Sequence, residues 1–343
     1  ISNESFCFAY TKTGDFMQWL LYLSLCGSLL FFPIEKEEIS IEKEEVLGSY
    51  CVMSMKDNRI LKNSRPEYTQ SVASISKIMT AIIVIEEGNL DDTIIINDQI
   101  DFVEGSSLYL QKGDQYSILD LLYGLLLRSG NDAAILLATH VGGEVDHFVE
   151  MMNRKANDIG MKQSIFHNPS GLDEEDGGNI SSSCDMALLM SYAMQNDTFR
   201  KITGTKEYRC SNGKYMKNKN RFLNHYLYAT GGKTGYTKKA KRTLVTTSKK
   251  ENTEIVVVTL NAFDDFHLHE LLHEDAYEKY ETVTLINKGN YLIDHHIYHI
   301  PSDLTLTIKK QDHDAIFLYF DKQKKKIHVK VQYHKFEKEY VYE

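Results

Sequence analysis

The stretch from Ser74 to about Glu87 places the strongest constraint on the fold, because it reads as a helix that is apolar on almost every side. A helix without a polar face is buried in a protein core. Lys77 nevertheless stands in its first turn, and an unpaired ammonium in apolar surroundings is costly. The sequence therefore predicts a domain that encloses this helix and gives Lys77 a partner. The apolar positions of the stretch are Ile78, Met79, Ala81, Ile82, Val84 and Ile85.

Segments with the pattern of strands precede and follow a central region with the pattern of helices. An early hairpin is expected over 49–62, around the turn 56–59. Strands at both ends with helices between them favour an α+β domain over residues 49–281, in which one antiparallel sheet joins the early and late segments beside a helical cluster. The further helices are expected over 117–141, with a break at 128–130, over Cys184–Met194 and over Asp264–Glu281, and the late strands over Gly231–Thr237, Thr243–Ser248 and Glu254–Leu260.

Two segments with other patterns flank this domain. Residues 35–48 are rich in Glu and Lys, which indicates a solvated spacer. Residues 282–343 alternate lysines with β-branched and aromatic side chains, as in KKKIHVKVQY, which indicates a small separate β-rich module. The length of 343 residues, at roughly 150 residues per domain, also favours two domains.

Ser74 and Lys77 form a Ser-x-x-Lys pair, which suggests a serine nucleophile activated by a lysine base. Residues three apart on a helix lie on one face, about 5–6 Å apart at Cβ. Burial disfavours the charged form of lysine and lowers its pKa from about 10.4. A neutral amine beside Ser74 can take the hydroxyl proton and make the oxygen nucleophilic, and the helix start offers backbone N–H groups to the attacked carbonyl.

Two more motifs follow, and each can have either a catalytic or a purely structural role. In Ser129-Gly130-Asn131 the serine can relay a proton to a leaving amine and Asn131 can bind a substrate amide, or the segment can be a helix break with Asn131 as its N-cap. In Lys233-Thr234-Gly235 a cation and a hydroxyl can hold a carboxylate while glycine admits the substrate backbone, or the motif can be an ordinary hairpin strand with a solvated lysine.

The three motifs stand in the order found in penicillin-binding proteins and class A β-lactamases. Over about residues 49–281 the chain closely resembles the serine D-alanyl-D-alanine carboxypeptidases, the low-molecular-mass penicillin-binding proteins of the peptidase S11 type. The resemblance implies a β-lactamase/transpeptidase-like α+β fold and no cofactor. It is carried by SVASISKIMTA (71–81), GSSLYLQKG (105–113), DLLYGLLLRSGNDAA (120–134), NPSGL (168–172) and GKTGYTKKA (232–240).

The same resemblance implies a role for each motif residue. Ser74 is then the acylated nucleophile, Lys77 its base and Ser129 a proton shuttle. Asn131 orients the peptide, and Lys233 and Thr234, followed by Gly235, hold the terminal carboxylate of D-alanine. The backbone N–H groups of Ser74 and Tyr236 form the oxyanion hole. Arg221, in NKNRFL, is expected to contact the substrate.

Two alternatives remain open, one because class A β-lactamases share the three motifs and one because the chain departs from the family pattern. The segment Asp173–Ser183 carries Asn179 where relatives often have His or Tyr, so the pocket rim and the turnover are expected to differ. A class A-like β-lactamase would use a glutamate for deacylation, for which Glu174 and Glu175 are candidates. A catalytically impaired wall-binding protein would keep the pocket without turnover.

One motif suggests a different chemistry. His269-Glu270-Leu271-Leu272-His273 matches His-Glu-x-x-His, the helical pattern of zinc peptidases. A catalytic zinc needs a third protein ligand, and the usual downstream extension is absent, although Asp294, His295 and His296 lie at a possible distance. We expect no catalytic metal and read this helix as rich in His and Glu for solvation.

The N-terminal residues 1–34 indicate export. Phe16–Ile34 holds no charged residue over 19 positions, which suits a membrane-spanning helix or the core of a secretion signal. Cleavage of the segment is left open. Without it Cys51, Cys184 and Cys210 remain; their odd number leaves at least one thiol free, and no disulfide is needed to explain the fold.

The charge balance excludes one class of partner. The chain has 48 acidic and 39 basic residues, a net charge of −9, and such a surface does not favour phosphate backbones, so we expect no nucleic-acid binding. The sequence thus predicts a bacterial, extracytoplasmic serine carboxypeptidase, attached to the membrane by its N-terminal segment. Its expected partners are peptidoglycan stem peptides ending in D-Ala-D-Ala and β-lactam antibiotics.

Overall fold

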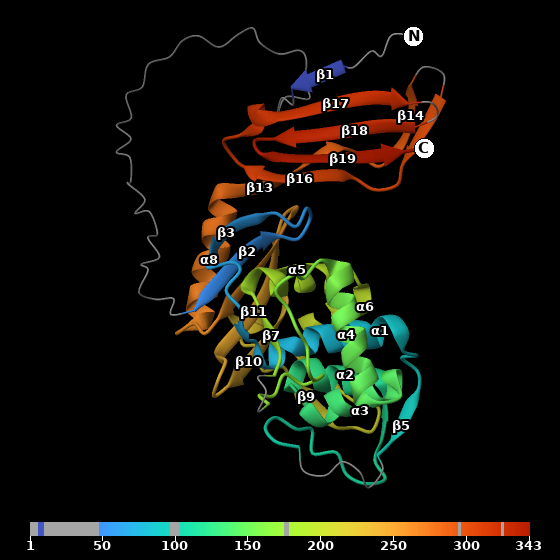
Figure 1. The fold of residues 1–343 in the computed structure, drawn as a ribbon, viewed down its shortest axis with the longest axis vertical. Coiled ribbons are helices and arrows are strands. Elements are labelled where there is room, and N and C mark those ends of the chain that lie inside the picture. Colours follow the sequence, from blue (N-terminus) through green and yellow to red (C-terminus); the bar gives the residue numbers. More distant parts are fainter. Residues whose placement is uncertain (1–5, 10–47, 97–102, 175–177, 294–295, 324–325) are drawn as a thin grey trace, which may run out of the picture. The chain divides into compact units, whose positions relative to one another are not determined.

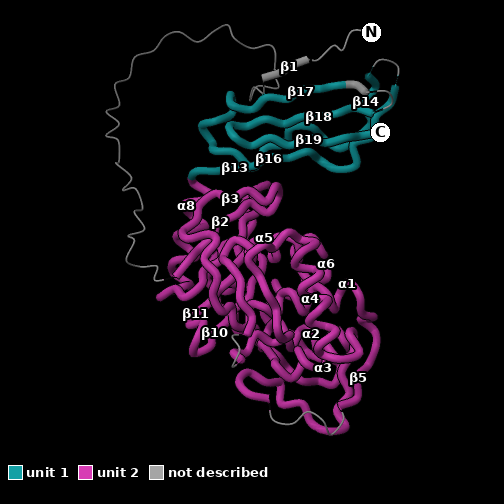
Figure 2. The backbone as a smooth tube through the Cα atoms, in the orientation of Figure 1, with its two compact units in different colours: residues 1–40, 279–343 teal, residues 41–278 magenta. Residues whose placement is uncertain are grey.

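The computed structural model describes residues 6–9, 48–96, 103–174, 178–293, 296–323 and 326–343. The chain divides into two compact units, residues 41–278 and residues 279–343 together with 1–40 (Figure 2). The apolar segment Phe16–Ile34 and nearly all of the charged spacer lie outside the described residues. Within the described part of the chain, no helix has both the length and the apolar character needed to cross a bilayer.

The centre of the larger unit is a five-stranded antiparallel sheet with the order β10-β11-β12-β2-β3 (Figure 1). The early strand β2 pairs with the late strand β12, with Val52 opposite Val257, so the expected α+β sheet that joins both ends of the domain is confirmed. Its strands are β2 (Ser49–Ser54), β3 (Ile60–Ser64), β10 (Ala229–Thr237), β11 (Lys241–Lys250) and β12 (Thr253–Leu260).

The two faces of this sheet pack against different helices, because successive side chains of a strand point to opposite faces. On one face Cys51 and Met53 join the main core, which also contains α1 (Lys77–Glu87) and α5 (Ser183–Ala193). On the other face Tyr50 and Val52 pack against α8 (Asp265–Lys279).

The helix α1 is enclosed, as its apolar sequence predicts. Its residues 77–84 are all buried, and it contacts α3 (Asn131–Gly142), α4 (Val145–Ile159), α5 and α6 (Asp197–Gly204). The start differs from the expectation, because Ser74 lies in a 3-10 turn, η1 (Ala73–Ser76), that precedes the first α-helical turn.

The helical break predicted at residues 128–130 follows a π-helical turn, which is wound more loosely than an α-helix. The helix α2 (Ile118–Tyr123) continues into a π-helical turn, η2 (Gly124–Arg128), and Ser129 then takes a left-handed conformation with φ of 65° before α3 begins. Single π turns occur frequently at functional sites. The remaining elements of this unit are β4 (Gln70–Ser71), β5 (Thr93–Ile95), β6 (Gln115–Ser117), β7 (Ile180–Ser181), β8 (Glu207–Arg209), β9 (Tyr215–Lys217) and α7 (Phe222–His225).

The smaller unit is β-rich in its described residues. It has a sheet of order β1-β17-β18-β19 and the pairs β13-β16 and β14-β15, and Leu306, Ile316, Val329 and Val331 lie in its own apolar core. Its elements are β1 (Phe6–Ala9), β13 (Tyr280–Ile286), β14 (Gly289–Ile293), β15 (His296–Ile300), β16 (Leu304–Lys309), η3 (His313–Ala315), β17 (Ile316–Gln323), β18 (Lys326–Tyr333) and β19 (Phe336–Tyr342).

The two histidines of the His-Glu-x-x-His motif are buried between α8 and the sheet, so the expectation that they are solvated is wrong. His269 lies 2.7 Å from Thr246 Oγ1 through Nδ1 and 2.9 Å from Thr259 Oγ1 through Nε2. His273 lies 2.8 Å from Thr246 Oγ1 and 2.7 Å from Ser248 Oγ. Burial lowers the pKa of His273 to about 3. All four ring nitrogens therefore bind hydroxyls, and the motif is part of the packing between helix and sheet.

Candidate active site

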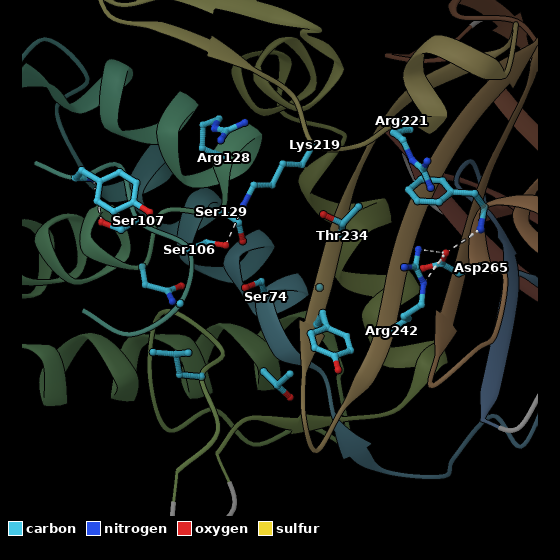
Figure 3. A pocket seen from close by; sticks show the side chains of 18 residues that line it. Ser74, Ser106, Ser107, Arg128, Ser129, Lys219, Arg221, Thr234, Arg242 and Asp265 are labelled. Atoms are coloured by element: carbon cyan, nitrogen blue, oxygen red, sulfur yellow. Dashed lines mark hydrogen bonds and ion pairs between the residues drawn. The ribbon is translucent and has the colours of Figure 1, made fainter. Parts of the chain in front are cut away.

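Residues from all three motifs line one cleft of about 650 Å³ in the larger unit (Figure 3). Ser74 enters it from η1, Ser129 and Asn131 from the turn between η2 and α3, and Thr234 and Gly235 from β10. Three stretches far apart in the sequence thus meet around a single concave surface.

The amine of Lys77 lies fully buried beneath Ser74. Its Nζ is 3.1 Å from Ser74 Oγ and 2.6 Å from Asn131 Oδ1, and it also donates to the carbonyl of Ser170. The carbonyl of Glu104 accepts from Asn131 Nδ2 at 2.7 Å, which fixes the amide so that Oδ1 faces the lysine. Two neighbours of Nζ are therefore obligate acceptors. They take the two N–H groups of a neutral amine, and the lone pair is left for the hydroxyl of Ser74.

The electrostatics favour that neutral amine. Burial is the largest cause that holds the pKa of Lys77 well below its usual value, and the positive charges of Lys233 and Lys219 lower it further. A neutral amine is a base, whereas an ammonium is not. The lowered pKa therefore favours the neutral form of Lys77, which is the form that can accept a proton.

A second buried lysine, Lys233, contacts Ser129. Lys233 is buried, and its Nζ lies 3.0 Å from Ser129 Oγ and 2.7 Å from the carbonyl oxygen of Thr234. Burial, with a smaller contribution from Lys219, lowers the pKa of Lys233 to about 7. Ser129 thus connects the cleft to an amine that exchanges its proton near neutral pH.

The backbone just before Ser74 is held in an uncommon conformation. Ala73 has a φ of 51°, a region that residues other than glycine rarely adopt and that is often found at functional sites. The loop Asn168–Leu172 lies behind this turn, and a Cβ on Gly171 would come 2.0 Å from the carbonyl oxygen of Ala73. Thr80 Oγ1 donates to the carbonyl of Pro169 at 2.7 Å. This NPSGL loop therefore supports η1 and supplies the Ser170 carbonyl to Lys77.

Gly235 lets β10 run directly beside Ser74. A Cβ on Gly235 would come 2.4 Å from Thr243 Oγ1 and 3.1 Å from the backbone nitrogen of Ser74. The next residue, Tyr236, lines the cleft and is 65% exposed. The strand thus brings the backbone at Tyr236 and the backbone N–H of Ser74 to the same wall of the cleft.

The cleft is positively charged beyond what the motifs predict. Among the described residues that line it, four are cations and Asp265 is the one anion, and Asp265 pairs with Arg242 at 2.5 Å. Arg128 and Lys219 lie on the side of Ser129, and Arg221 and Arg242 lie beyond Thr234 (Figure 3). Arg221, expected as a substrate contact, does line the cleft, with its guanidinium 4.9 Å from the ring centre of Phe266.

The sequence analysis missed Lys219, although Arg221 in the same NKNRFL segment was selected. Lys219 Nζ lies 2.9 Å from Ser106 Oγ, and its charge lowers the pKa of both Lys77 and Lys233. Nothing in the local pattern distinguishes it from an exposed lysine. Only the structure shows that its neighbours Asn218 and Asn220 are both buried and hold this segment against the domain.

Two expectations about the segment Asp173–Ser183 change. Asn179 is buried away from the cleft, and its Oδ1 accepts from the backbone N–H of His167 at 2.7 Å, so it shapes the NPSGL loop and not the pocket rim. Glu174 accepts from Asn168 Nδ2 at 2.6 Å and does not line the cleft, which does not fit a deacylating glutamate. Glu175 lies outside the described residues.

Comparison with known proteins identifies the family. Residues 38–264 match the sequence profile of the D-alanyl-D-alanine carboxypeptidases, peptidase S11. D-alanyl-D-alanine carboxypeptidase DacF of Bacillus subtilis is 32% identical over 213 residues, which are 60% of this chain and 54% of DacF. The chain therefore spans about half the length of that relative.

Solved structures show the same fold. The crystal structure of D-alanyl-D-alanine carboxypeptidase from Mycobacterium tuberculosis is similar with a TM-score of 0.64 and 28% identity, over 67% of this chain and 90% of that one. Penicillin-binding protein 5 of Haemophilus influenzae is similar with a TM-score of 0.72 over 86% of this chain and 95% of that one, at 22% identity. The chain belongs to the D-alanyl-D-alanine carboxypeptidase family of serine peptidases, as its three motifs predict.

Proposed function

We propose that this protein removes the terminal D-alanine of peptidoglycan stem peptides through an acyl-enzyme on Ser74. The observation that carries the proposal is the set of contacts around the Lys77 amine, which leaves its lone pair for the Ser74 hydroxyl. Ser74 Oγ attacks the carbonyl carbon of the penultimate D-alanine, and its proton passes to Lys77 Nζ. The C–N bond then breaks, and water later hydrolyses the ester.

The leaving amine needs a proton, and Ser129 is placed to deliver it. Its hydroxyl faces the cleft from one side and lies 3.0 Å from Lys233 Nζ on the other. A proton passed from Ser129 to the departing D-alanine is replaced from Lys233, whose pKa of about 7 suits such an exchange. The backbone N–H groups of Ser74 and Tyr236 stabilise the oxyanion of the tetrahedral intermediate.

The charge of the cleft supports binding of the terminal carboxylate. Thr234 and Gly235 line the cleft next to the buried Lys233, and the cations that line the cleft attract a negatively charged peptide end. Asn131 orients the peptide while it holds Lys77, and Arg221 contacts the substrate from the opposite wall. β-Lactams acylate the same serine, since their strained amide resembles the D-alanyl-D-alanine bond.

The family acts on the cell wall, so we place this protein outside the cytoplasm. Phe16–Ile34 supports attachment to the membrane or export, because it is long and apolar enough for either role. Peptidoglycan stem peptides and β-lactams are then the partners that meet the cleft.

Acylation by a fluorescent penicillin tests the nucleophile. We expect a single adduct, which peptide mapping places on Ser74, and no adduct with Ser74→Ala. Ser107→Ala is the matched control, because Ser107 also lines the cleft but its Oγ hydrogen-bonds Asp132 at 2.6 Å. A label on another residue would refute the assignment of Ser74.

Release of D-alanine from a diacetylated tripeptide ending in D-Ala-D-Ala tests the reaction. We expect release by the wild type, unchanged by a chelator, and none by Ser74→Ala. A penicillin adduct without D-alanine release would instead indicate the catalytically impaired wall-binding protein. Rapid hydrolysis of penicillin, without a lasting adduct, would indicate a β-lactamase.

A further inference from the structure

Two cysteines that the proposed reaction does not use meet inside the larger unit. Cys51 lies in the interior strand β2 and Cys184 in the first turn of α5, and their sulfurs are 2.7 Å apart although 133 positions separate them in the sequence. A disulfide bond measures about 2.04 Å, so the two sulfurs lie within 1 Å of bonding distance. We propose that Cys51 and Cys184 form a disulfide in the exported protein.

Other uses of this pair fit less well. Neither sulfur lines the cleft, and no group of three or more metal-binding side chains occurs in the described parts of the chain, whereas structural zinc takes four ligands. The nearby carboxylate of Asp185 accepts from the backbone N–H of Gln163 at 2.6 Å and from Ser164 Oγ at 2.7 Å. A covalent bond between the sulfurs remains as the chemistry that this geometry favours.

The exposure of the two sulfurs gives the order of the reaction. Cys51 is fully buried, and Cys184 is half-buried. The hydrogen bond with Cys184 and burial raise the pKa of the Cys51 thiol well above its usual value, so Cys184 is the sulfur that meets an external oxidant first. Because disulfides form in oxidising compartments, the inference rests on the proposed placement outside the cytoplasm.

The oxidant required is another disulfide, either a small one such as oxidised glutathione or that of a thiol oxidoreductase. The Cys184 thiolate attacks one sulfur of that disulfide and releases the first thiol. The Cys51 thiolate then attacks the Cys184 sulfur in the mixed disulfide and releases the second thiol. Two protein thiols are oxidised, the external disulfide is reduced to two thiols, and the two protons pass to those thiols.

The bond would join two elements that position the site. β2 is a central strand of the sheet, and α5 contacts both β2 and the helix α1 that carries Lys77. A cross-link between residues so distant in sequence restricts the unfolded chain strongly. Reduction is therefore expected to lower the melting temperature, on the order of 10 °C.

Peptide mapping of the exported full-length chain, alkylated at lysis and digested with trypsin without reduction, is the first test. We expect peptide 44–56, with Cys51, linked to peptide 163–200, with Cys184. Cys210 is the internal control, because it is buried in the loop between β8 and β9 and lies in the separate peptide 210–214. Recovery of two separate peptides from the exported protein, with Cys51 and Cys184 each alkylated, would overturn the proposal.

Thermal melting is the second test. A phosphine reductant should lower the melting temperature of the wild type and of Cys210→Ala equally, and leave Cys51→Ala/Cys184→Ala unchanged. The double variant is expected to melt at a lower temperature than the oxidised wild type, so the test compares only the change in melting temperature that the reductant causes. Equal responses of the double variant and the wild type would count against the disulfide. Failure of penicillin to acylate Ser74 would refute the proposed function and leave these results unaffected.

Discussion

Asn131 has two functions that depend on the orientation of one amide. Its Nδ2 donates to the carbonyl of Glu104, and its Oδ1 accepts from Lys77. The side chain can bind Lys77 without adding charge, so burial and the neighbouring lysines keep the pKa of Lys77 low. A carboxylate at this position would favour the ammonium form instead.

The change Asn131→Asp should therefore raise the pKa of Lys77 and move the acidic limb of the acylation profile to higher pH. The sign follows from the base, which acts only when neutral, so activity appears above its pKa. The measurement is the second-order rate of acylation by a fluorescent penicillin between pH 5 and 10. If Asn131→Asp lowers the acylation rate at every pH and leaves the acidic limb of the profile at the same pH, the assignment of Lys77 as base is contradicted.

Lys233 shows the cost in stability of a buried amine. Its pKa of about 7 in the folded protein is well below its ordinary value of about 10.4. Between these two values the unfolded chain binds a proton that the folded chain does not bind. The free energy of unfolding therefore rises with pH across this window, and the full penalty is present below pH 7.

The change Lys233→Met should raise the melting temperature at pH 7 while acylation is lost. Its advantage over the wild type should shrink as the pH rises toward 10, because the wild type regains that stability as its unfolded state loses the proton. Paired thermal melts from pH 6 to 10 measure the difference. Lys201→Met, at an exposed position of α6, is the control and should show no such trend. A pH-independent difference for Lys233→Met would contradict the lowered pKa.

At the scale of elements, the cleft exists because β10 and η1 approach each other closely. Gly235 permits this approach, since a Cβ there would meet Thr243 Oγ1 at 2.4 Å and the backbone nitrogen of Ser74 at 3.1 Å. Thr243 cannot easily move away, because it is buried and donates to the carbonyl of Val72 at 3.0 Å. The strand and the turn are thus fixed at a short distance by backbone and buried side chains.

The change Gly235→Ala should lower the acylation rate by a factor of about 10² or more, because a displacement of about 1 Å at the reacting groups is enough for such a loss. Gly113→Ala is the matched control, since Gly113 has a φ of 85° but no atom within 4 Å of the added Cβ. It should lower the melting temperature through backbone strain and leave acylation unchanged. Acylation by Gly235→Ala at the wild-type rate would show that the approach is not required.

At the scale of the whole molecule, the site belongs to one unit. Every described residue that lines the cleft lies within residues 41–278. The smaller unit has an apolar core of its own, built from residues such as Leu306, Ile316 and Val329. Acylation should therefore depend on the larger unit alone.

A chain shortened to residues 41–279 should keep acylation by penicillin within a factor of about two of the full chain, because it retains α8 and the whole cleft. The measurement is the acylation rate, with a thermal melt to show that the shortened chain is folded. A folded but inactive shortened chain would show that the smaller unit contributes to the site.

Local patterns in the sequence predict much of this architecture. The apolar helix after Ser74, the break before Asn131 and the late strands all appear in the structure near their expected bounds. These features depend on residues close in sequence, since periodicity and turn residues act over a few positions. The start of the helix was harder to predict, because the 3-10 turn at Ser74 is stabilised by a distant loop at Gly171.

The sequence by itself determined the family and the three motifs, because the chemistry of a serine, a lysine and a glycine at fixed spacing can be recognised without coordinates. The tertiary structure decided which other groups complete the site and that the His-Glu-x-x-His motif belongs to the packing between helix and sheet. The carbonyl of Ser170, the charge of Lys219 and the hydroxyls around His269 reach their partners only after the chain folds. Their positions depend on long-range packing, and the pKa of a buried amine depends on every charge and dipole that this packing brings near it.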